Sequence, residues 1–336
     1  MSTKDGRWTQ ILFDFNTQSV TAAIHFNERY YVGTAADGLR VVQPDRHGGY
    51  EWYPLHAGAD SFASDRVTAL AHVDGALWVG TADAGISIWD PQTNRWATMN
   101  STNSQLPSNT VHHIRTTNPF NGPFVGGIWV ATSGGVLQWK AGKVTQLFTK
   151  QKGLPSNDVW DVDASMNPLG PEFYFATDVG MVRYEGGPKK VIPGEGDCTF
   201  DRATQLVVAR DRTIWLAVAT KTEVGTGWEP QGLCRLSVGF FMNQWQAYRV
   251  ATGNLPSNTI TALKIDDVGR VWASLIATND NERGGVAFYD GQAWQLVTPP
   301  QTGMIQAPIG MLQRADKELL LSHVDTDGLT IFIPAR

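Results

Sequence analysis

A unit of four short β-type segments recurs seven times along this chain, and this repeat limits the fold more than any other feature. Three copies open with the sequence Leu-Pro-Ser-Asn, which starts at Leu106, Leu154 and Leu255. An apolar first segment follows, then a second segment with an aromatic residue in six of the seven copies, and then a third that begins at a glycine. Since alternating and apolar runs of this length are typical of strands, the repeat predicts seven four-stranded units.

The two ends of the chain complete one unit between them. The seventh copy stops at Arg336 without a fourth segment, and the segment Arg7-Trp-Thr-Gln-Ile-Leu12 resembles the fourth segments of other copies. Four short strands cannot bury both faces of their sheet alone, whereas seven sheets packed around an axis bury one another. The sequence therefore predicts an all-β fold, a seven-bladed β-propeller with four antiparallel strands in each blade, whose ring is closed by the N-terminal strand.

We expect one domain over residues 1–336, with residues 7–14 as the closing strand of blade 7. The expected blades are approximately 15–56, 64–100, 106–150, 154–195, 200–250, 255–298 and 305–336.

The repeated sequence resembles that of the two-component-regulator propeller family. The pattern of this family begins with Leu-Pro-Ser-Asn. It continues with a Trp that lies between apolar and small residues and is followed by Thr, and it ends with Gly-Gly. The resemblance covers residues 7–336 and is best in blades 2, 3 and 6. It implies a propeller of the kind found in the sensory regions of bacterial hybrid sensor kinases, several of which sense oligosaccharides. This chain has one propeller, no membrane span and no kinase, which leaves ligand or partner binding. It resembles the streptogramin lyase propeller more distantly.

The charge balance argues against several classes of partner. The formal net charge is −5 and the pI is near 5.8, which excludes general electrostatic binding to nucleic acid or to an anionic membrane. No apolar run reaches the length of a membrane span, and the start lacks a signal-type apolar stretch. We expect a cytoplasmic location, or a periplasmic one if this start is not the natural one.

The two cysteines, Cys198 and Cys234, are too few for a disulfide framework or a structural zinc site. We expect two partly buried thiols, with a single disulfide as the alternative in an exported chain. We expect no metal and no cofactor.

Two of the thirteen tryptophans fall outside the repeat. The other eleven fill repeated positions, so we interpret them as packing residues. Trp160 lies on the first strand of blade 4, where other blades have threonine. Trp228 lies in an insertion between the second and third strands of blade 5, residues 219–231. Trp228 either stacks on a sugar or peptide or packs against its own loop.

A polar cluster occupies the first strands of blades 3 and 4: His112, His113, Arg115, Asp161 and Asp163. Strict alternation would let only one of the two histidines face the central channel. We favour hydrogen-bonded channel lining over a metal or catalytic site, because convergence of three ligands is not evident. The candidate ligand contacts are Trp160, Asp161, His113 and Trp228.

No nucleophile elbow, zinc-protease motif or phosphate loop is present in the sequence. The favoured function is non-enzymatic, sensor-like binding of a small polar ligand such as an oligosaccharide, or of a protein partner, on the loop-bearing channel face. One alternative is a propeller lyase or hydrolase with a site near His113 and Asp161. The other is a scaffold subunit of a larger assembly.

Overall fold

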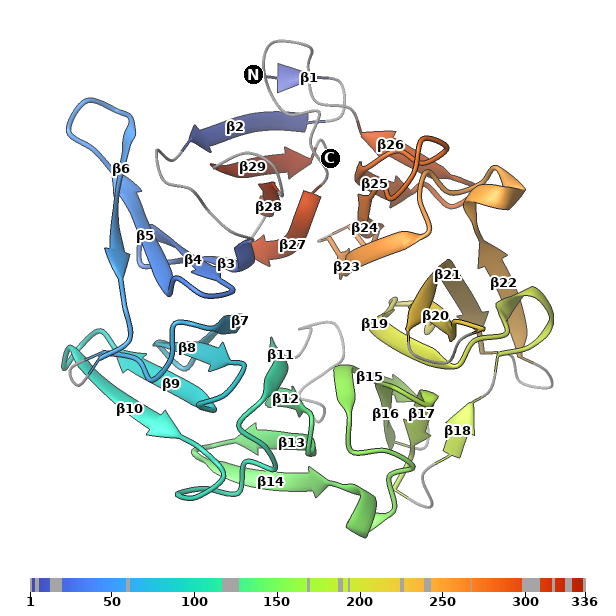
Figure 1. Cartoon of the computed structure of the whole chain (residues 1–336), viewed down its shortest axis with the longest axis horizontal. Coiled ribbons are helices and arrows are strands. Elements are labelled where there is room, and N and C mark those ends of the chain that lie inside the picture. The colour runs from blue at the N-terminus through green and yellow to red at the C-terminus, as the bar shows by residue number, and fades with distance from the viewer. Residues whose placement is uncertain are drawn as a thin grey trace.

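Seven antiparallel sheets surround a central axis, and the first strand of each sheet lies innermost (Figure 1). The computed structural model describes the following residues: 2–3, 6–12, 20–58, 61–116, 127–167, 170–186, 190–192, 194–223, 227–238, 243–266, 268–297, 309–315, 318–323 and 328–334. The predicted seven-bladed β-propeller is confirmed.

Blades 1 to 6 each consist of four consecutive strands, ordered from the axis outward. Blade 1 has β3 (Val20–Phe26), β4 (Arg29–Thr34), β5 (Leu39–Pro44) and β6 (Tyr50–Leu55). Blade 2 has β7 (Val67–Val73), β8 (Ala76–Thr81), β9 (Ile86–Asp90) and β10 (Arg95–Met99). Blade 3 has β11 (Val111–Thr116), β12 (Ile128–Thr132), β13 (Gly135–Lys140) and β14 (Lys143–Phe148). Blade 4 has β15 (Val159–Asn167), β16 (Gly170–Thr177), β17 (Gly180–Tyr184) and β18 (Lys190–Ile192). Blade 5 has β19 (Arg202–Val208), β20 (Ile214–Lys221), β21 (Trp228–Ser237) and β22 (Gln244–Tyr248). Blade 6 has β23 (Thr259–Ile265), β24 (Val271–Ile276), β25 (Gly285–Tyr289) and β26 (Trp294–Val297).

Blade 7 combines both ends of the chain. Its strands are β27 (Ile309–Ala315), β28 (Glu318–His323), β29 (Gly328–Pro334), β2 (Gly6–Leu12) and a short fifth strand β1 (Ser2–Thr3). The pairing of β2 with β29 runs from Gly6 with Pro334 to Leu12 with Gly328, so closure by the N-terminal strand is confirmed (Figure 1). The side chain of Trp8 stacks on Phe332, with ring centroids 4.2 Å apart.

The core lies between neighbouring blades. Second strands are buried on both faces, and all five residues of β12 are buried. The tryptophans of the second strands are at most 3% exposed, as expected of packing residues. Trp129, for example, packs against Phe148 of its own blade and Phe173 of blade 4. This burial against neighbours explains why the repeat favours an aromatic residue there.

The Leu-Pro-Ser-Asn segments join consecutive blades through repeated hydrogen bonds. In each copy the serine hydroxyl accepts a hydrogen bond from the backbone N–H two residues later, and the asparagine side-chain oxygen accepts one from a backbone N–H of the preceding connection. The six bonds involve Ser108, Ser156, Ser257, Asn109, Asn157 and Asn258. The recurrence of both bonds supports an architectural function for this motif.

A β-bulge occurs at the same place in all seven first strands. The residue without a paired partner is Thr21, Thr68, His112, Trp160, Thr204, Thr261 or Gly310. A bulge breaks the alternation of side chains. The positions of His112 and His113 therefore follow from the bulge rather than from simple alternation: His112 is the extra residue, and His113 pairs with Ala131.

The expectation of two partly buried thiols is wrong. Cys198 and Cys234 form a disulfide, with their Cα atoms 5.7 Å apart, and both residues are at most 1% exposed. Cys198 ends a short 3₁₀ turn, Gly196–Cys198, in the connection between blades 4 and 5, and Cys234 lies in β21. The disulfide therefore ties this connection to the third strand of blade 5.

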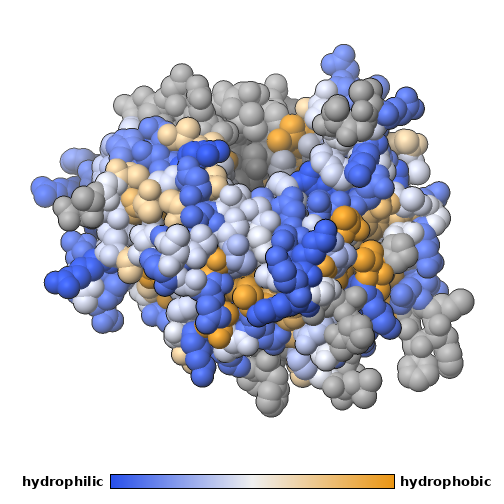
Figure 2. Space-filling view, turned by 60° about the horizontal axis from the view of Figure 1, so that its bottom comes forward, coloured by the Kyte–Doolittle hydropathy of each residue, from blue (hydrophilic) through white to orange (hydrophobic). Residues whose placement is uncertain are grey.

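The outer surface is mostly hydrophilic, and its hydrophobic areas are small and separate in the face that Figure 2 shows. Among the described residues, the large hydrophobic side chains that are exposed are Tyr50, Tyr53, Val179, Val191 and Val268. They belong to blades 1, 4 and 6. No helix in the described part of the chain is long and apolar enough to cross a membrane.

Candidate functional site

The four candidate ligand contacts separate into two neighbouring groups. His113 and Asp161 lie with charged residues that connect blades 3, 4 and 5. Trp160 and Trp228 lie around Arg202 at the end of the blades where the first strands begin. The first group is predominantly structural, and the second is accessible.

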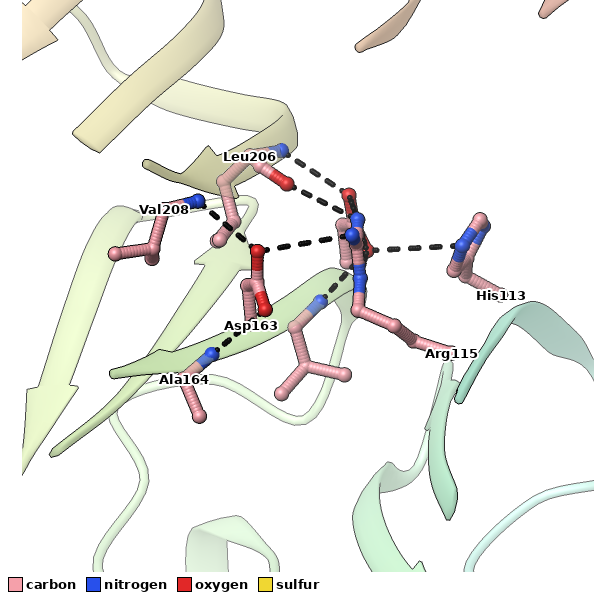
Figure 3. Close-up of polar contacts among 8 residues, drawn as sticks. His113, Arg115, Asp163, Ala164, Leu206 and Val208 are labelled. Carbon is pink, nitrogen blue, oxygen red and sulfur yellow. Dashed lines mark hydrogen bonds and ion pairs between the residues drawn. The ribbon is translucent and has the colours of Figure 1, made fainter. Parts of the chain in front are cut away.

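We call Arg115, Asp161 and Asp163 the interblade clamp (Figure 3). Arg115 extends from β11 and donates hydrogen bonds from Nη2 to both carboxylate oxygens of Asp161, at 2.9 and 2.7 Å. The same nitrogen donates to the carbonyl oxygen of Leu206 in β19, at 3.0 Å. Nη1 of Arg115 lies 3.7 Å from Oδ2 of Asp163. One guanidinium thus contacts blades 4 and 5 from blade 3.

The two aspartates satisfy backbone groups at the inner edge of blade 5. The N–H of Leu206 donates to Oδ2 of Asp161 at 3.1 Å, and the N–H of Val208 donates to Oδ2 of Asp163 at 2.9 Å (Figure 3). An innermost strand is a sheet edge, and its backbone donors need acceptors when they are buried. The clamp supplies these acceptors across the boundary between blades 4 and 5.

The charges of the clamp explain its pKa shifts. Burial alone would raise the pKa of Asp161, but the adjacent Arg115 holds that pKa below its ordinary value. Burial raises the pKa of Asp163, which lies farther from the guanidinium. Asp161 is 0% exposed, and both of its oxygens accept hydrogen bonds from the protein. Contact between Asp161 and a ligand remains a prediction, while its structural function is evident.

His113 lies beside the clamp in the central channel. Its Nε2 is 4.0 Å from Oδ1 of Asp161, and its side chain is 22% exposed. Burial lowers the pKa of His113 to about 3, so the imidazole is neutral near neutral pH. Burial also lowers the pKa of Lys264, on β23, to about 8. Within the described residues, no group of three or more potential metal ligands converges.

The second group is a continuous stack of planar side chains, His112, Trp160, Arg202 and Trp228, which we call the aromatic–arginine stack. The His112 ring stacks on the Trp160 ring at a centroid distance of 4.2 Å and an angle of 20°. The Arg202 guanidinium carbon lies 4.0 Å from the Trp160 ring. His112 comes from blade 3 and Arg202 from blade 5, on opposite sides of blade 4, so they cover the two faces of the indole.

Trp228 ends the stack on the other side of Arg202. The guanidinium carbon lies 5.0 Å from the Trp228 ring, and Nζ of Lys221 lies 6.0 Å from the same ring. The expected insertion is partly an extension of the β20–β21 hairpin, in which Trp228 pairs with Lys221. This pairing brings Trp228 back over the start of β19. Trp228 thus contacts Arg202 and Lys221 of its own blade and is partly exposed. Its stacking on a sugar or peptide stays a prediction.

Asp158, the residue before β15, fixes the first member of the stack. Its Oδ1 lies 2.8 Å from Nε2 of His112. Burial would raise the pKa of Asp158, but the hydrogen bond and charge of His112, and the charge of Arg202, lower it overall. The contact orients the imidazole for stacking on Trp160.

Sequence reasoning missed Arg202 and did not choose His112. Arg202 occupies the position two residues before the bulge, which is Arg66, Thr110, Asp158 and Thr259 in other blades. Because this position varies between blades, the repeat gives no signal there. His112 could have been found from the same departure from threonine that singled out Trp160.

Comparisons with solved structures identify the fold. Two extracellular domains from B. thetaiotaomicron, of the putative hybrid two-component system BT3049 and the putative one-component system BT4673, superpose with TM-scores of 0.65 at 14% and 16% identity. They cover 94% and 97% of this chain, and the chain spans 40% of each of them. Virginiamycin B lyase from Staphylococcus aureus superposes with a TM-score of 0.61 at 12% identity, over 97% of this chain and 99% of the lyase.

No protein-family model matches the chain, and a search of curated proteins finds no match either. The identities of these structures to the chain are well below the level that would transfer a function. These structures confirm, at the level of the fold, the resemblance found in the repeat: this chain is a seven-bladed propeller similar to extracellular domains of a putative hybrid two-component system and a putative one-component system.

Proposed function

We propose that this propeller is a non-enzymatic binding module that contacts a small polar ligand or a segment of a protein partner through the aromatic–arginine stack. The observation that carries the proposal is the convergence of Trp160 and Trp228 on Arg202. These two tryptophans are the ones that the repeat does not require. Both contact Arg202 at one end of blades 4 and 5, and the packing pattern of the repeat does not explain this arrangement.

Within the stack, Trp228 offers the main contact surface. Both faces of Trp160 are covered, by His112 and Arg202. Trp228 has one face toward Arg202 and remains partly exposed. A partly exposed indole stacks well on a sugar ring or an aromatic side chain. Trp160 therefore serves mainly to hold Arg202, and through it the position of Trp228.

Two features favour this proposal over the alternatives. A site near His113 and Asp161 would need carboxylate oxygens that already accept several hydrogen bonds from the protein. A scaffold subunit usually presents a large apolar patch, but the exposed large hydrophobic residues among those described are few and divided among blades. The similarity to extracellular domains of putative two-component and one-component systems is compatible with ligand binding.

We expect Trp228→Ala to abolish ligand-induced stabilisation. The probes are a panel of neutral and acidic oligosaccharides and short peptides, and the measurement is a thermal-shift assay. A ligand at 100 times its Kd stabilises the folded state by about 2.7 kcal/mol, which raises the Tm by roughly 2–4 °C in a chain of this size. The matched control is Trp52→Ala on the outer strand of blade 1. A shift that Trp228→Ala leaves intact would argue against the stack as the binding site.

We also propose that the chain acts in an oxidising compartment, because a buried disulfide such as Cys198–Cys234 is maintained there and is rare in a reducing cytosol. Closing a loop of this length contributes about 4 kcal/mol in the chain-entropy view. We expect protein exported to a bacterial periplasm to show no free thiol after denaturation in an alkylating reagent. Two alkylated cysteines in the exported, stable protein would contradict the proposal.

A further inference from the structure

Arg202 has hydrogen-bonding capacity that the described part of the chain does not use. Its guanidinium is held between the rings of Trp160 and Trp228. Its Nε is buried, and none of the described residues accepts a hydrogen bond from this atom. A guanidinium carries five N–H donors in one plane, and buried donors without acceptors are costly. The rings fix the position of Arg202, but they leave its donors free.

The charges around Arg202 limit which anions it can bind. Asp158 and Asp178 interact with it electrostatically, but neither approaches to ion-pair distance, and Asp158 already binds His112. Burial lowers the pKa of Arg202 and these two carboxylates oppose that effect, so the guanidinium remains charged. Two nearby negative charges disfavour a doubly charged phosphate more than a singly charged carboxylate. Lys221, whose Nζ lies 6.0 Å from the Trp228 ring, adds a positive charge beside the stack.

We propose that Arg202 binds a carboxylate of the ligand, while Trp228 contacts the carbon skeleton next to that carboxylate. This inference rests on the proposed function and names the chemistry of its ligand. A carboxylate fits the planar guanidinium through two parallel hydrogen bonds. Stacking between two indoles restricts the rotation of the Arg202 side chain before the ligand binds. Binding of the carboxylate therefore costs less conformational entropy. The carboxylate belongs either to an acidic sugar or to an acidic side chain in a peptide.

The test measures binding of two matched pairs of probes by isothermal titration calorimetry on the full chain. One pair is trigalacturonate and its fully methyl-esterified form, and the other is tetraglutamate and tetraglutamine, both N-acetylated and C-terminally amidated. We expect the acidic member of one pair to bind at least tenfold more tightly than its neutral counterpart, and the pair that does so identifies the source of the carboxylate. Arg202→Gln should weaken that binding tenfold or more. Arg202→Lys, which keeps the charge but loses the paired donors, should give an intermediate loss.

The matched control is Arg66→Gln. Arg66 occupies the same repeat position in blade 2, but its side chain is 60% exposed and pairs with Asp83. Its loss should change the affinity less than twofold, which separates a specific site from general charge. Equal binding of the neutral probe, or undiminished binding of the acidic probe by a folded Arg202→Gln, overturns the carboxylate proposal and leaves the proposed function standing. If neither pair binds, the carboxylate proposal also fails, and the thermal-shift experiment with Trp228→Ala decides the proposed function separately.

Discussion

Deleting residues 1–14 should unfold the propeller or lower its Tm by far more than the loss of an ordinary terminal segment. The deletion removes β2, which supplies the outer pairing for all of β29 and inserts Trp8, 2% exposed, against Phe332. Burial of Trp8 and Ile11 is lost, and a long apolar edge of blade 7 becomes exposed. Trp8→Ala alone should cost about 3–5 kcal/mol. Thermal and urea unfolding monitored by circular dichroism measure both effects.

Trp96→Ala is the control for this prediction. Trp96 fills the same repeat position in the fourth strand of blade 2, but it is only partly buried and does not close the ring. We expect it to destabilise the chain clearly less than Trp8→Ala. A truncated chain that keeps the Tm of the full chain would show that β29 and the rest of blade 7 are stable without the N-terminal strand, and would refute closure by that strand.

The fold was accessible from the sequence because each blade repeats the same physical requirement. Burial between neighbours requires an aromatic residue in the second strand, and the Ser and Asn of Leu-Pro-Ser-Asn bond the connection in every copy that has them. Such requirements produce a periodic pattern in the sequence. The departures from that pattern were also informative, since Trp160 and Trp228 both contact Arg202.

The remaining parts of the site depend on contacts that no periodic pattern in the sequence indicates. Arg202 lies at a position that varies between blades, so its place between two indoles follows only from the extended β20–β21 hairpin. The alternation of apolar and polar residues also gives no sign of the bulge that makes His112 the extra residue. The disulfide joins a connection to a strand within blade 5, and two cysteines in a sequence do not reveal whether they are close enough to pair.

Asp161→Asn should be among the most destabilising single substitutions in the chain. It preserves the shape of the side chain but leaves the buried Arg115 without its principal counter-charge, and removal of one partner from a buried ion pair costs about 3–5 kcal/mol. The lowered pKa of Asp161 sets the pH range of this contribution. The stabilisation is complete above the ordinary value of 3.8 and is lost only as the pH falls through the lower pKa of the folded state.

A double-mutant cycle with Arg115→Gln tests whether the clamp acts as a unit. If Asp161 and Arg115 stabilise each other, the double variant should be less destabilised than the sum of the single variants, since neither charge is then left alone. Asp163→Asn is the comparison: Asp163 lies 3.7 Å from Arg115 and its pKa is raised, so its charge contributes less. Urea unfolding at neutral pH gives the free energies of the four proteins of the cycle and of Asp163→Asn. Additive effects of Asp161→Asn and Arg115→Gln would mean that the two residues stabilise the protein independently, and that the clamp does not act as a unit.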